Sequence, residues 1–253
     1  MTRVIAVASG KGGVGKTTMT ANLGVELSKQ GEDVLIIDGN FSGANVSQHF
    51  GIEFQEVTLN DVLDGDAYIT EAVSKHHAGV SVVPASVLEF SSDPEKLKHT
   101  LVDFLGEKDY VFIDCAAGVG EEVEASIGAA DEVLLVSEPE VPALTNCLGA
   151  KKLADEMDKE VIGLVLNGVR GETSEVSAED AEDLVETEVV GKVPDDGHVR
   201  EAIAMKEPVV SYRSNCRASH AISDVAYRVQ GEEPPERGFS HQVKVALEEF
   251  SLF

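Results

Sequence analysis

Short runs of apolar residues alternate with longer amphipathic stretches along most of the chain. The first run covers residues 4–8, and a helical pattern follows it as far as residue 30. Further runs, such as 34–37, 111–113 and 133–136, are apolar at consecutive positions, so both faces of each strand must be covered. Strands of this kind belong to a parallel sheet with helices on both sides. The sequence therefore predicts a doubly wound α/β fold with a mostly parallel sheet.

The pattern continues without an internal boundary, so residues 1–230 are expected to form one domain. A length of 253 residues is compatible with a single core. A linker rich in Pro, Gly and Glu is predicted at 231–238, followed by an amphipathic C-terminal segment at 239–253. That segment carries one lysine against two glutamates, so docking on this chain or on a partner is favoured. Peripheral contact with a membrane stays open as the alternative.

A glycine-rich motif stands between the first predicted strand and the first predicted helix. Residues 9–18 read SGKGGVGKTT and satisfy the pattern G-x-x-x-x-G-K-[ST] in the strand–loop–helix context that gives the pattern meaning. Its glycines let backbone N–H groups converge on phosphate oxygens at the helix N-terminus. Lys16 supplies a charge for the β- and γ-phosphates, and the Thr17 hydroxyl can ligate Mg²⁺. The motif predicts a site for a nucleotide and Mg²⁺.

A second lysine inside the loop, Lys11, makes the motif resemble the deviant Walker A signature of the MinD/ParA family of P-loop ATPases, with MinD the nearest branch. The resemblance implies ATP and Mg²⁺ as cofactors. It also implies that Lys11 reaches across a dimer interface to the partner's nucleotide. ATP would then join two copies of the chain, and hydrolysis would separate them. A homodimer and further protein partners are the expected assemblies.

The resemblance extends over most of residues 3–230. Residues 36–45 resemble the family's switch I, and residues 110–118 resemble its Walker B strand and switch II. It implies metal-site roles for Thr17, Asp38 and Asp114, and catalytic roles for Lys11, Lys16, Asp38 and Asn40. The nucleotide-binding residues that it implies are Gly10, Lys11, Gly12, Gly13, Val14, Gly15, Lys16, Thr17 and Thr18 in the loop, and Asn167, Pro194, Asp195 and Asp196 on the adenine side.

Asn40 departs from the family pattern, in which switch I carries two aspartates spaced by one residue. The second aspartate orients or activates the attacking water, but an amide cannot take a proton from it. The sequence therefore predicts slow or absent hydrolysis. Retained turnover is the alternative, and the sequence leaves open whether Asn40 is natural or was introduced to hold ATP.

The chain carries 46 acidic and 20 basic residues, a formal net charge of −26. Such a surface repels phosphate backbones, so nonspecific binding of nucleic acid is not expected. The acidic residues are spread along the chain, which favours an acidic homologue of the haloarchaeal type over an ordinary solvated surface. No apolar run is long enough for a membrane span, and no signal peptide is recognisable, so a cytoplasmic protein is predicted, with a peripheral position at the membrane or pole left open.

Cysteine and histidine add no metal site to these expectations. Three cysteines without a C-x-x-C pair predict buried free thiols. His76 and His77 could be ligands, but nothing near them in the sequence completes a metal shell, so they are interpreted as loop residues.

Four functions remain compatible with the sequence. A MinD-like switch that positions partner proteins at a division site or pole, or in the control of cell shape, is favoured. A ParA-like partition ATPase is disfavoured by the acidic surface, and an iron–sulfur carrier by the lack of paired cysteines. A nonhydrolysing ATP-dependent binding module is kept open because of Asn40.

Overall fold

The computed structural model describes residues 1–41, 43–52, 54–86 and 93–236. Its strands are β1 (Arg3–Ala8), β2 (Val34–Gly39), β3 (Ser74–Lys75), β4 (Ser81–Val83), β5 (Tyr110–Cys115), β6 (Glu132–Ser137), β7 (Glu160–Val169) and β8 (Val189–Pro194). They form one eight-stranded sheet in the order β3-β4-β2-β5-β1-β6-β7-β8. All neighbouring pairs are parallel except β3 and β4. The predicted doubly wound, mostly parallel α/β fold is confirmed.

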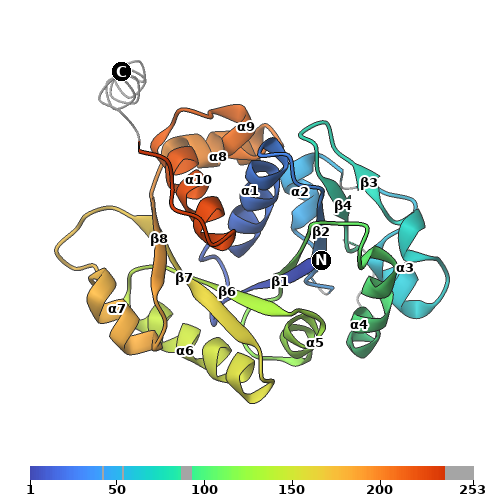
Figure 1. Cartoon of the computed structure of the whole chain (residues 1–253), viewed down its shortest axis with the longest axis horizontal. Coiled ribbons are helices and arrows are strands. Elements are labelled where there is room, and N and C mark those ends of the chain that lie inside the picture. The colour runs from blue at the N-terminus through green and yellow to red at the C-terminus, as the bar shows by residue number, and fades with distance from the viewer. Residues whose placement is uncertain (42, 53, 87–92, 237–253) are drawn as a thin grey trace.

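Helices cover both faces of this sheet (Figure 1). One face carries α1 (Lys16–Lys29), α2 (Val46–Phe50), α8 (Gly197–Ala204), α9 (Val209–Tyr212) and α10 (Arg217–Val229). The other carries α3 (Leu59–Asp64), α4 (Leu97–Thr100), α5 (Glu121–Ala129), α6 (Val141–Glu156) and α7 (Ala178–Val185). Short 3-10 helices occupy η1 (Ile69–Glu71), η2 (Pro94–Lys96) and η3 (Leu101–Phe104).

The two cores meet at the central strands, whose side chains alternate between them. In β1, Val4 and Ala6 pack into one core, whereas Ile5 and Val7 pack into the other. The alternation follows from the two-residue period of a strand. Because both sides are apolar, Ile5 and Val7 are as fully buried as Ala6. Burying a large aliphatic side chain contributes about 1.5–3 kcal/mol, so this double burial explains the continuous apolar runs.

Parallel strands bring the loops that follow them to one edge of the sheet. The loop after β1 carries the glycine-rich motif, and β2 and β5 end beside it in a register that places Asp38 opposite Asp114. Ligands of open α/β sheets bind at this carboxyl edge, where the strand order reverses. The fold therefore brings together loops that are far apart in the sequence.

The described part of the chain ends shortly after the body of the fold. Helix α10 ends at Val229, and residues 231–236 of the predicted linker follow it without helix or strand. The predicted segment 239–253 and the end of the linker lie outside the described residues. The division into domain, linker and C-terminal segment stays a prediction.

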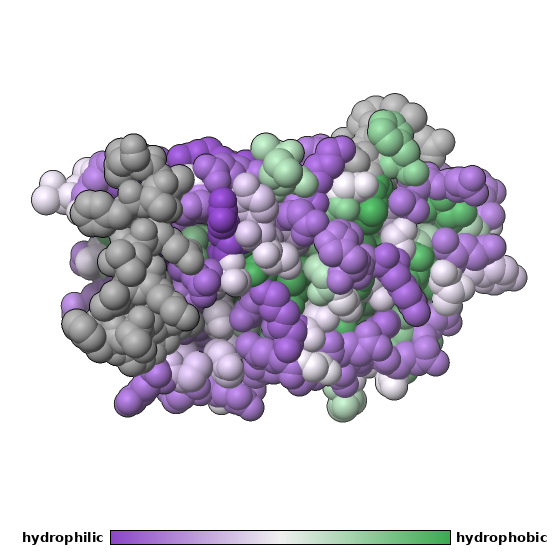
Figure 2. All heavy atoms as spheres, turned by 90° about the horizontal axis from the view of Figure 1, so that it is seen from above, coloured by the Kyte–Doolittle hydropathy of each residue, from purple (hydrophilic) through white to green (hydrophobic). Residues whose placement is uncertain are grey.

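The surface is mostly hydrophilic, and the cysteines are buried, as the composition predicts. Figure 2 shows a face on which hydrophilic residues predominate and hydrophobic ones lie scattered. Within the described ranges, no helix has both the length and the apolar character needed to cross a membrane. Cys115, Cys147 and Cys216 are buried free thiols, as predicted. The interpretation of the charge as an adaptation to high salt stays a prediction.

Candidate nucleotide-binding site

The glycine-rich loop has a backbone that only small residues permit. Gly13 and Gly15 have φ angles of 83° and 96°, in the left-handed region that glycine adopts without strain. A Cβ placed on Gly15 would lie 2.2 Å from Nδ2 of Asn167. That amide donates a hydrogen bond to the Val14 carbonyl oxygen at 2.8 Å. The end of β7 thus packs against the loop and holds it at the start of α1.

Lys16 is the first residue of α1 and points into the site. Its side chain is almost fully buried, and its Nζ donates to Ser9 Oγ at 2.9 Å. Burial lowers the pKa of Lys16, and the charge of Asp114 opposes that shift. A cavity of about 340 Å³, open to solvent, lies between the loop, α2 and the end of β5. It is lined by Gly12, Gly13, Gly15, Lys16, Thr17, Thr18, Asn40, Asn45, Gln48, His49, Cys115 and Ala117.

The predicted metal-site residues Thr17 and Asp114 are joined by a short hydrogen bond. Thr17 Oγ1 donates to Asp114 Oδ2 at 2.6 Å, and Thr20 Oγ1 lies 3.3 Å from Asp114 Oδ1. Thr17 lines the cavity, whereas Asp114 is buried behind it at the end of β5. A hydroxyl backed by a carboxylate is an oxygen donor set that suits Mg²⁺ and its water. The residues present therefore fit that ion.

Asp38 is fully buried at the end of β2 and caps the start of α2. Its carboxylate accepts hydrogen bonds from the backbone N–H groups of Asn40, Asn45 and Val46 at 3.2, 2.9 and 3.0 Å. This carboxylate thus ties the start of α2 to the end of β2.

The two buried carboxyls have strongly shifted acidities. Burial, together with the charge of Asp114, raises the pKa of Asp38 to about 8. Burial raises the pKa of Asp114 to about 6, although the bonds from Thr17 and the charge of Lys16 work against it. A divalent cation in the cavity would favour the ionised forms of both. The site is therefore electrostatically prepared for Mg²⁺.

Asn40 lines the same cavity from the other side. Its Nδ2 donates to the Gly43 carbonyl oxygen at 2.6 Å, which holds the amide within switch I. The structure thus brings Asn40 to the cavity that holds Lys16 and Thr17. Its role in hydrolysis stays a prediction.

His49 is a site residue that the sequence reasoning missed. Its Nε2 lies 3.2 Å from Thr18 Oγ1, and its Nδ1 lies 3.3 Å from the Asn45 carbonyl oxygen. Burial lowers its pKa, which favours the neutral ring. The imidazole therefore connects the first turn of α1 with switch I. A single histidine matches no motif, and its only signal was its position just after the switch I stretch.

Lys11 lies at the rim. Its Nζ is 3.4 Å from Glu138 Oε2, just beyond the end of β6, and its side chain is 47% exposed. The two lysines of the loop thus have different surroundings: Lys16 points inward, and Lys11 stays accessible.

The predicted adenine-side carboxylates are engaged with neighbouring groups. Asp195 pairs with Arg170 at 3.1 Å and with Arg200 at 3.0 Å, and the hydrogen bond from Arg170 lowers its pKa. Asp196 accepts from His198 Nδ1 at 2.8 Å and from the Ala218 N–H at 3.2 Å. Burial works in the opposite direction, but these hydrogen bonds lower the pKa of Asp196.

The adenine-side residues lie outside the lining of the phosphate cavity. Pro194, which ends β8, pairs with Val169 of β7. Among the described residues, Asn167, Pro194, Asp195 and Asp196 are absent from that lining, although Asn167 touches the loop beside it. Their contacts with a nucleotide stay predictions.

Comparison with known proteins agrees with this geometry. Residues 5–209 match the family profile of the CobQ/CobB/MinD/ParA nucleotide binding domain. The chain belongs to this family. The MinD/ParA resemblance carried by the Lys11 signature is thereby confirmed.

Relatives in this family match nearly the whole chain. An uncharacterised ATP-binding protein of Methanocaldococcus jannaschii is 37% identical over 99% of this chain and 94% of its own length. The septum site-determining protein MinD of Synechocystis is 33% identical over 93% of this chain and 92% of its own length.

Solved structures of the family superimpose closely. The cell division ATPase MinD of Pyrococcus furiosus has a TM-score of 0.87 and 32% identity, covering 91% of this chain and 99% of its own. MinD of Pyrococcus horikoshii, complexed with Mg-ADP, has a TM-score of 0.86 and 32% identity, with coverages of 90% and 96%. The MinC:MinD cell division complex of Aquifex aeolicus includes a chain with a TM-score of 0.82 and 32% identity, with coverages of 93% and 98%.

Proposed function

We propose that this chain is a MinD-like molecular switch that binds Mg-ATP, dimerises when ATP is bound and positions partner proteins in the cell. The family relationship supports a nucleotide-dependent activity, and the Mg-ADP complex of the Pyrococcus horikoshii relative supports this cofactor pair. In the site, Lys16 would contact the β- and γ-phosphates. Thr17, with Asp38 and Asp114 behind it, would hold the magnesium ion, which supplies charge neutralisation when bound.

The proposed ATP-dependent dimer rests on the different surroundings of Lys11 and Lys16. A loop that served only its own nucleotide would need Lys16 alone, which already faces the cavity. Lys11 instead has an accessible ammonium group at the rim, where it forms an ion pair with Glu138. Half-exposed ion pairs of this kind contribute about 0–1 kcal/mol, so Lys11 can exchange Glu138 for a stronger anion at little cost. The phosphates of a nucleotide in a second subunit are such an anion.

The rim also carries apolar surface. Val119, just before α5, is 51% exposed, and Val141, the first residue of α6, is 59% exposed. The loops that hold them follow β5 and β6 at the same edge of the sheet as Lys11. Exposed apolar side chains at the same edge of the sheet as an accessible lysine are suited to a face that is buried when two copies meet.

Hydrolysis should be slow in this chain. Asn40 can orient a water molecule by hydrogen bonds, but its amide cannot accept the water's proton. Positioning and charge stabilisation by Lys16 and the metal-site residues would leave some rate, because phosphoryl transfer depends strongly on both. ATP would then keep the dimer together for longer than in a fast ATPase.

Light scattering on the purified full chain tests the proposed dimer. With Mg-ATP we expect a mass near twice 26.9 kDa, and without nucleotide or with Mg-ADP a mass near 26.9 kDa. Lys11→Ala should stay monomeric with Mg-ATP. The matched control is Lys152→Ala, which removes an exposed lysine of α6. A wild-type chain that stays monomeric at every nucleotide and salt concentration would refute the switch.

Partner recognition is the second half of the proposal. The Aquifex aeolicus relative is found in a complex with MinC, and other relatives are septum site-determining proteins, so we propose a protein partner concerned with cell division or cell position. The net charge of −26 argues against nucleic acid as the main partner.

Residues 239–253 are proposed to act in recruitment, through a partner protein or through peripheral contact with a membrane. Deleting them should leave ATP affinity unchanged, because the nucleotide-site residues all lie between positions 10 and 196. Sedimentation with anionic lipid vesicles, for the full chain and for the truncated one, distinguishes the two routes. Loss of ATP affinity in the truncated chain would show that the segment belongs to the nucleotide-binding fold.

A further inference from the structure

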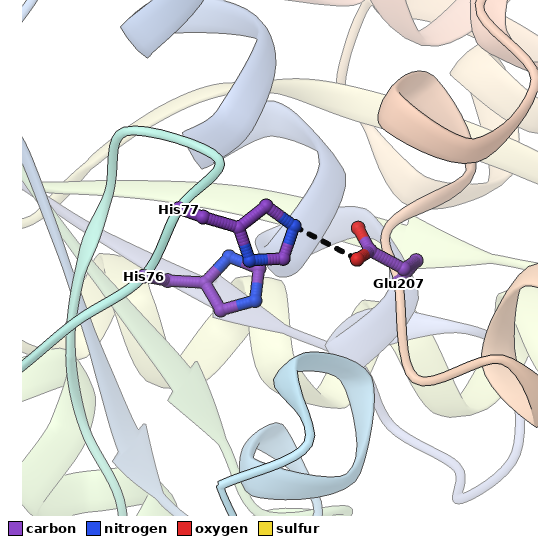
Figure 3. Close-up of side chains that lie close together, drawn as sticks. All are labelled: His76, His77 and Glu207. Atoms are coloured by element: carbon purple, nitrogen blue, oxygen red, sulfur yellow. Dashed lines mark ion pairs between the residues drawn. The ribbon is translucent and has the colours of Figure 1, made fainter.

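Two histidines and a glutamate converge on the surface, away from the nucleotide cavity. His76 and His77 come from the turn between β3 and β4, and Glu207 comes from the segment between α8 and α9 (Figure 3). Their ligand atoms all lie within 4.8 Å of one another. His77 Nε2 already forms an ion pair with Glu207 Oε1 at 2.8 Å.

The backbone on the histidine side is held by its own hydrogen bonds. The His76 N–H donates to the Val80 carbonyl oxygen at 2.9 Å, and the Gly79 N–H donates to the His76 carbonyl oxygen at 3.0 Å. Gly79 has a φ of 93°, which closes the turn in a conformation that glycine tolerates. The Ala78 N–H donates to His76 Nδ1 at 3.2 Å, a bond that the ring would exchange for the metal if it ligates through that nitrogen. The tight turn therefore fixes the backbone positions from which the side chains of His76 and His77 extend.

The glutamate side is anchored in a similar way. The Glu207 N–H donates to the Ala202 carbonyl oxygen at 3.0 Å, which ties the residue to the end of α8. Pro208 follows and leads into α9, so the segment has little freedom to move away. The two sides of the cluster are thus presented by well-supported backbones.

The rings are also packed in place. The His76 ring lies 5.0 Å from the Phe50 ring at an angle of 69°, and 4.0 Å from the His77 ring. Orienting contacts of this kind reduce the entropy that a ligand residue loses on coordination.

We propose that His76, His77 and Glu207 form a binding site for a divalent transition-metal ion of the zinc class. Two imidazoles and one carboxylate form a donor set that zinc accepts, with a water molecule completing four-coordination. In a tetrahedral site with bonds of about 2.1 Å, ligand atoms lie roughly 3.4 Å apart. Small side-chain rotations would bring the three donors to that spacing. The strongly acidic chain also favours cations near its surface.

The cation would join two parts of the fold. It would link the β3–β4 turn to the α8–α9 segment, and the Phe50 contact would extend the link to the end of α2. The proposal stands independently of ATP binding, because none of its three ligands lines the nucleotide cavity. The competing possibility is an ordinary His77–Glu207 ion pair that binds no metal.

Titration calorimetry with Zn²⁺ alone tests the site in the full chain at pH 7.5, after removal of any affinity tag and of chelators. We expect one ion per chain, and a loss of affinity of at least tenfold in His77→Ala and in Glu207→Gln. Glu207→Gln keeps the side-chain shape and so guards against an effect of misfolding. His99→Ala removes an exposed histidine of α4 and should bind as the wild type does.

Two further readouts locate the ion. Zn²⁺ should shift the ring resonances of His76 and His77 in NMR spectra and leave those of His99 unchanged. It should also raise the melting temperature of the wild type but not that of Glu207→Gln. Equal Zn²⁺ affinity in the wild type and in both ligand variants would overturn the proposal. So would a Zn²⁺ response confined to His198, which lies in a separate buried cluster with Asp196 and Cys216.

Discussion

The phosphate side and the adenine side of the candidate site use their charged residues in opposite ways. On the phosphate side, Lys16, Asp38 and Asp114 are buried close together, and burial shifts all three pKa values toward the neutral forms. On the adenine side, hydrogen bonds hold the carboxyl pKa values of Asp195 and Asp196 below their ordinary range.

The phosphate side is therefore suited to binding charged groups, whereas the charged residues of the adenine side stabilise the local fold. The phosphate side has buried carboxyls whose ionised forms lack a full set of counter-charges, so binding of a cation would relieve an existing penalty. The adenine side is already compensated by arginines, a histidine and backbone N–H groups. Changes on the phosphate side should therefore affect ligand binding and chemistry, and changes on the adenine side should affect mainly stability.

The largest expected effect is on turnover in Asn40→Asp. Placing a carboxylate at this position gives the attacking water a proton acceptor, and general-base catalysis contributes on the order of 10²–10⁴ in rate. We expect phosphate release to rise by about 10²-fold or more in the variant. Steady-state phosphate release under saturating Mg-ATP measures it. Equal rates in both chains would remove Asn40 from the mechanism.

Lys16→Ala should abolish most of the ATP affinity. A hydrogen bond to a charged group contributes about 1.5–3 kcal/mol, so a loss of roughly 10- to 100-fold in affinity is expected. Equilibrium binding of a fluorescent ATP analogue measures the change, with Lys152→Ala as the surface control. An affinity within twofold of the wild type would show that Lys16 does not contact the phosphates.

Asp38→Asn should change how stability depends on pH. In the folded chain the pKa of Asp38 is raised to about 8, above the ordinary value of 3.8. The native state therefore binds more protons than the unfolded state between about pH 4 and pH 8, and this carboxyl's contribution to the free energy of unfolding falls as pH rises through that window.

The variant lacks this titration, so its stability relative to the wild type should increase from pH 5 to pH 8. Urea unfolding at constant ionic strength without Mg²⁺ measures the difference. Adding Mg-ATP should flatten the wild-type dependence. A difference between the two chains that does not vary with pH would contradict the raised pKa.

The smallest expected effect lies on the adenine side. Asp196→Ala removes the cap of α8 and the partner of His198, which should lower the free energy of unfolding by about 0.5–2 kcal/mol. Arg170→Ala breaks an exposed pair with Asp195 and should change the free energy of unfolding less than Asp196→Ala does, because solvent screens exposed ion pairs. ATP affinity should stay within a few-fold of the wild type in both. A large loss of affinity in Asp196→Ala would instead support the predicted nucleotide contact.

Much of the molecule could be predicted from short stretches of sequence. The apolar runs indicated strands covered on both faces, because a strand buried on both sides needs apolar residues at consecutive positions. The motif at 9–18 indicated the phosphate site, because a glycine-rich loop and the helix after it are built from neighbouring residues. Both inferences need only the pattern of residues that are close along the chain.

Other features depend on contacts between distant residues, and only the tertiary structure shows them. The pairing of Lys11 with Glu138, and that of Asp195 with Arg170, follow from loops that the parallel sheet brings to one edge. His49 reaches Thr18 because Asp38 fixes the start of α2. The sequence predicts that His76 and His77 are loop residues, and the structure places both in the turn between β3 and β4. Glu207 lies far from them in the sequence. It joins the two histidines only because the fold packs the α8–α9 segment beside the β3–β4 turn.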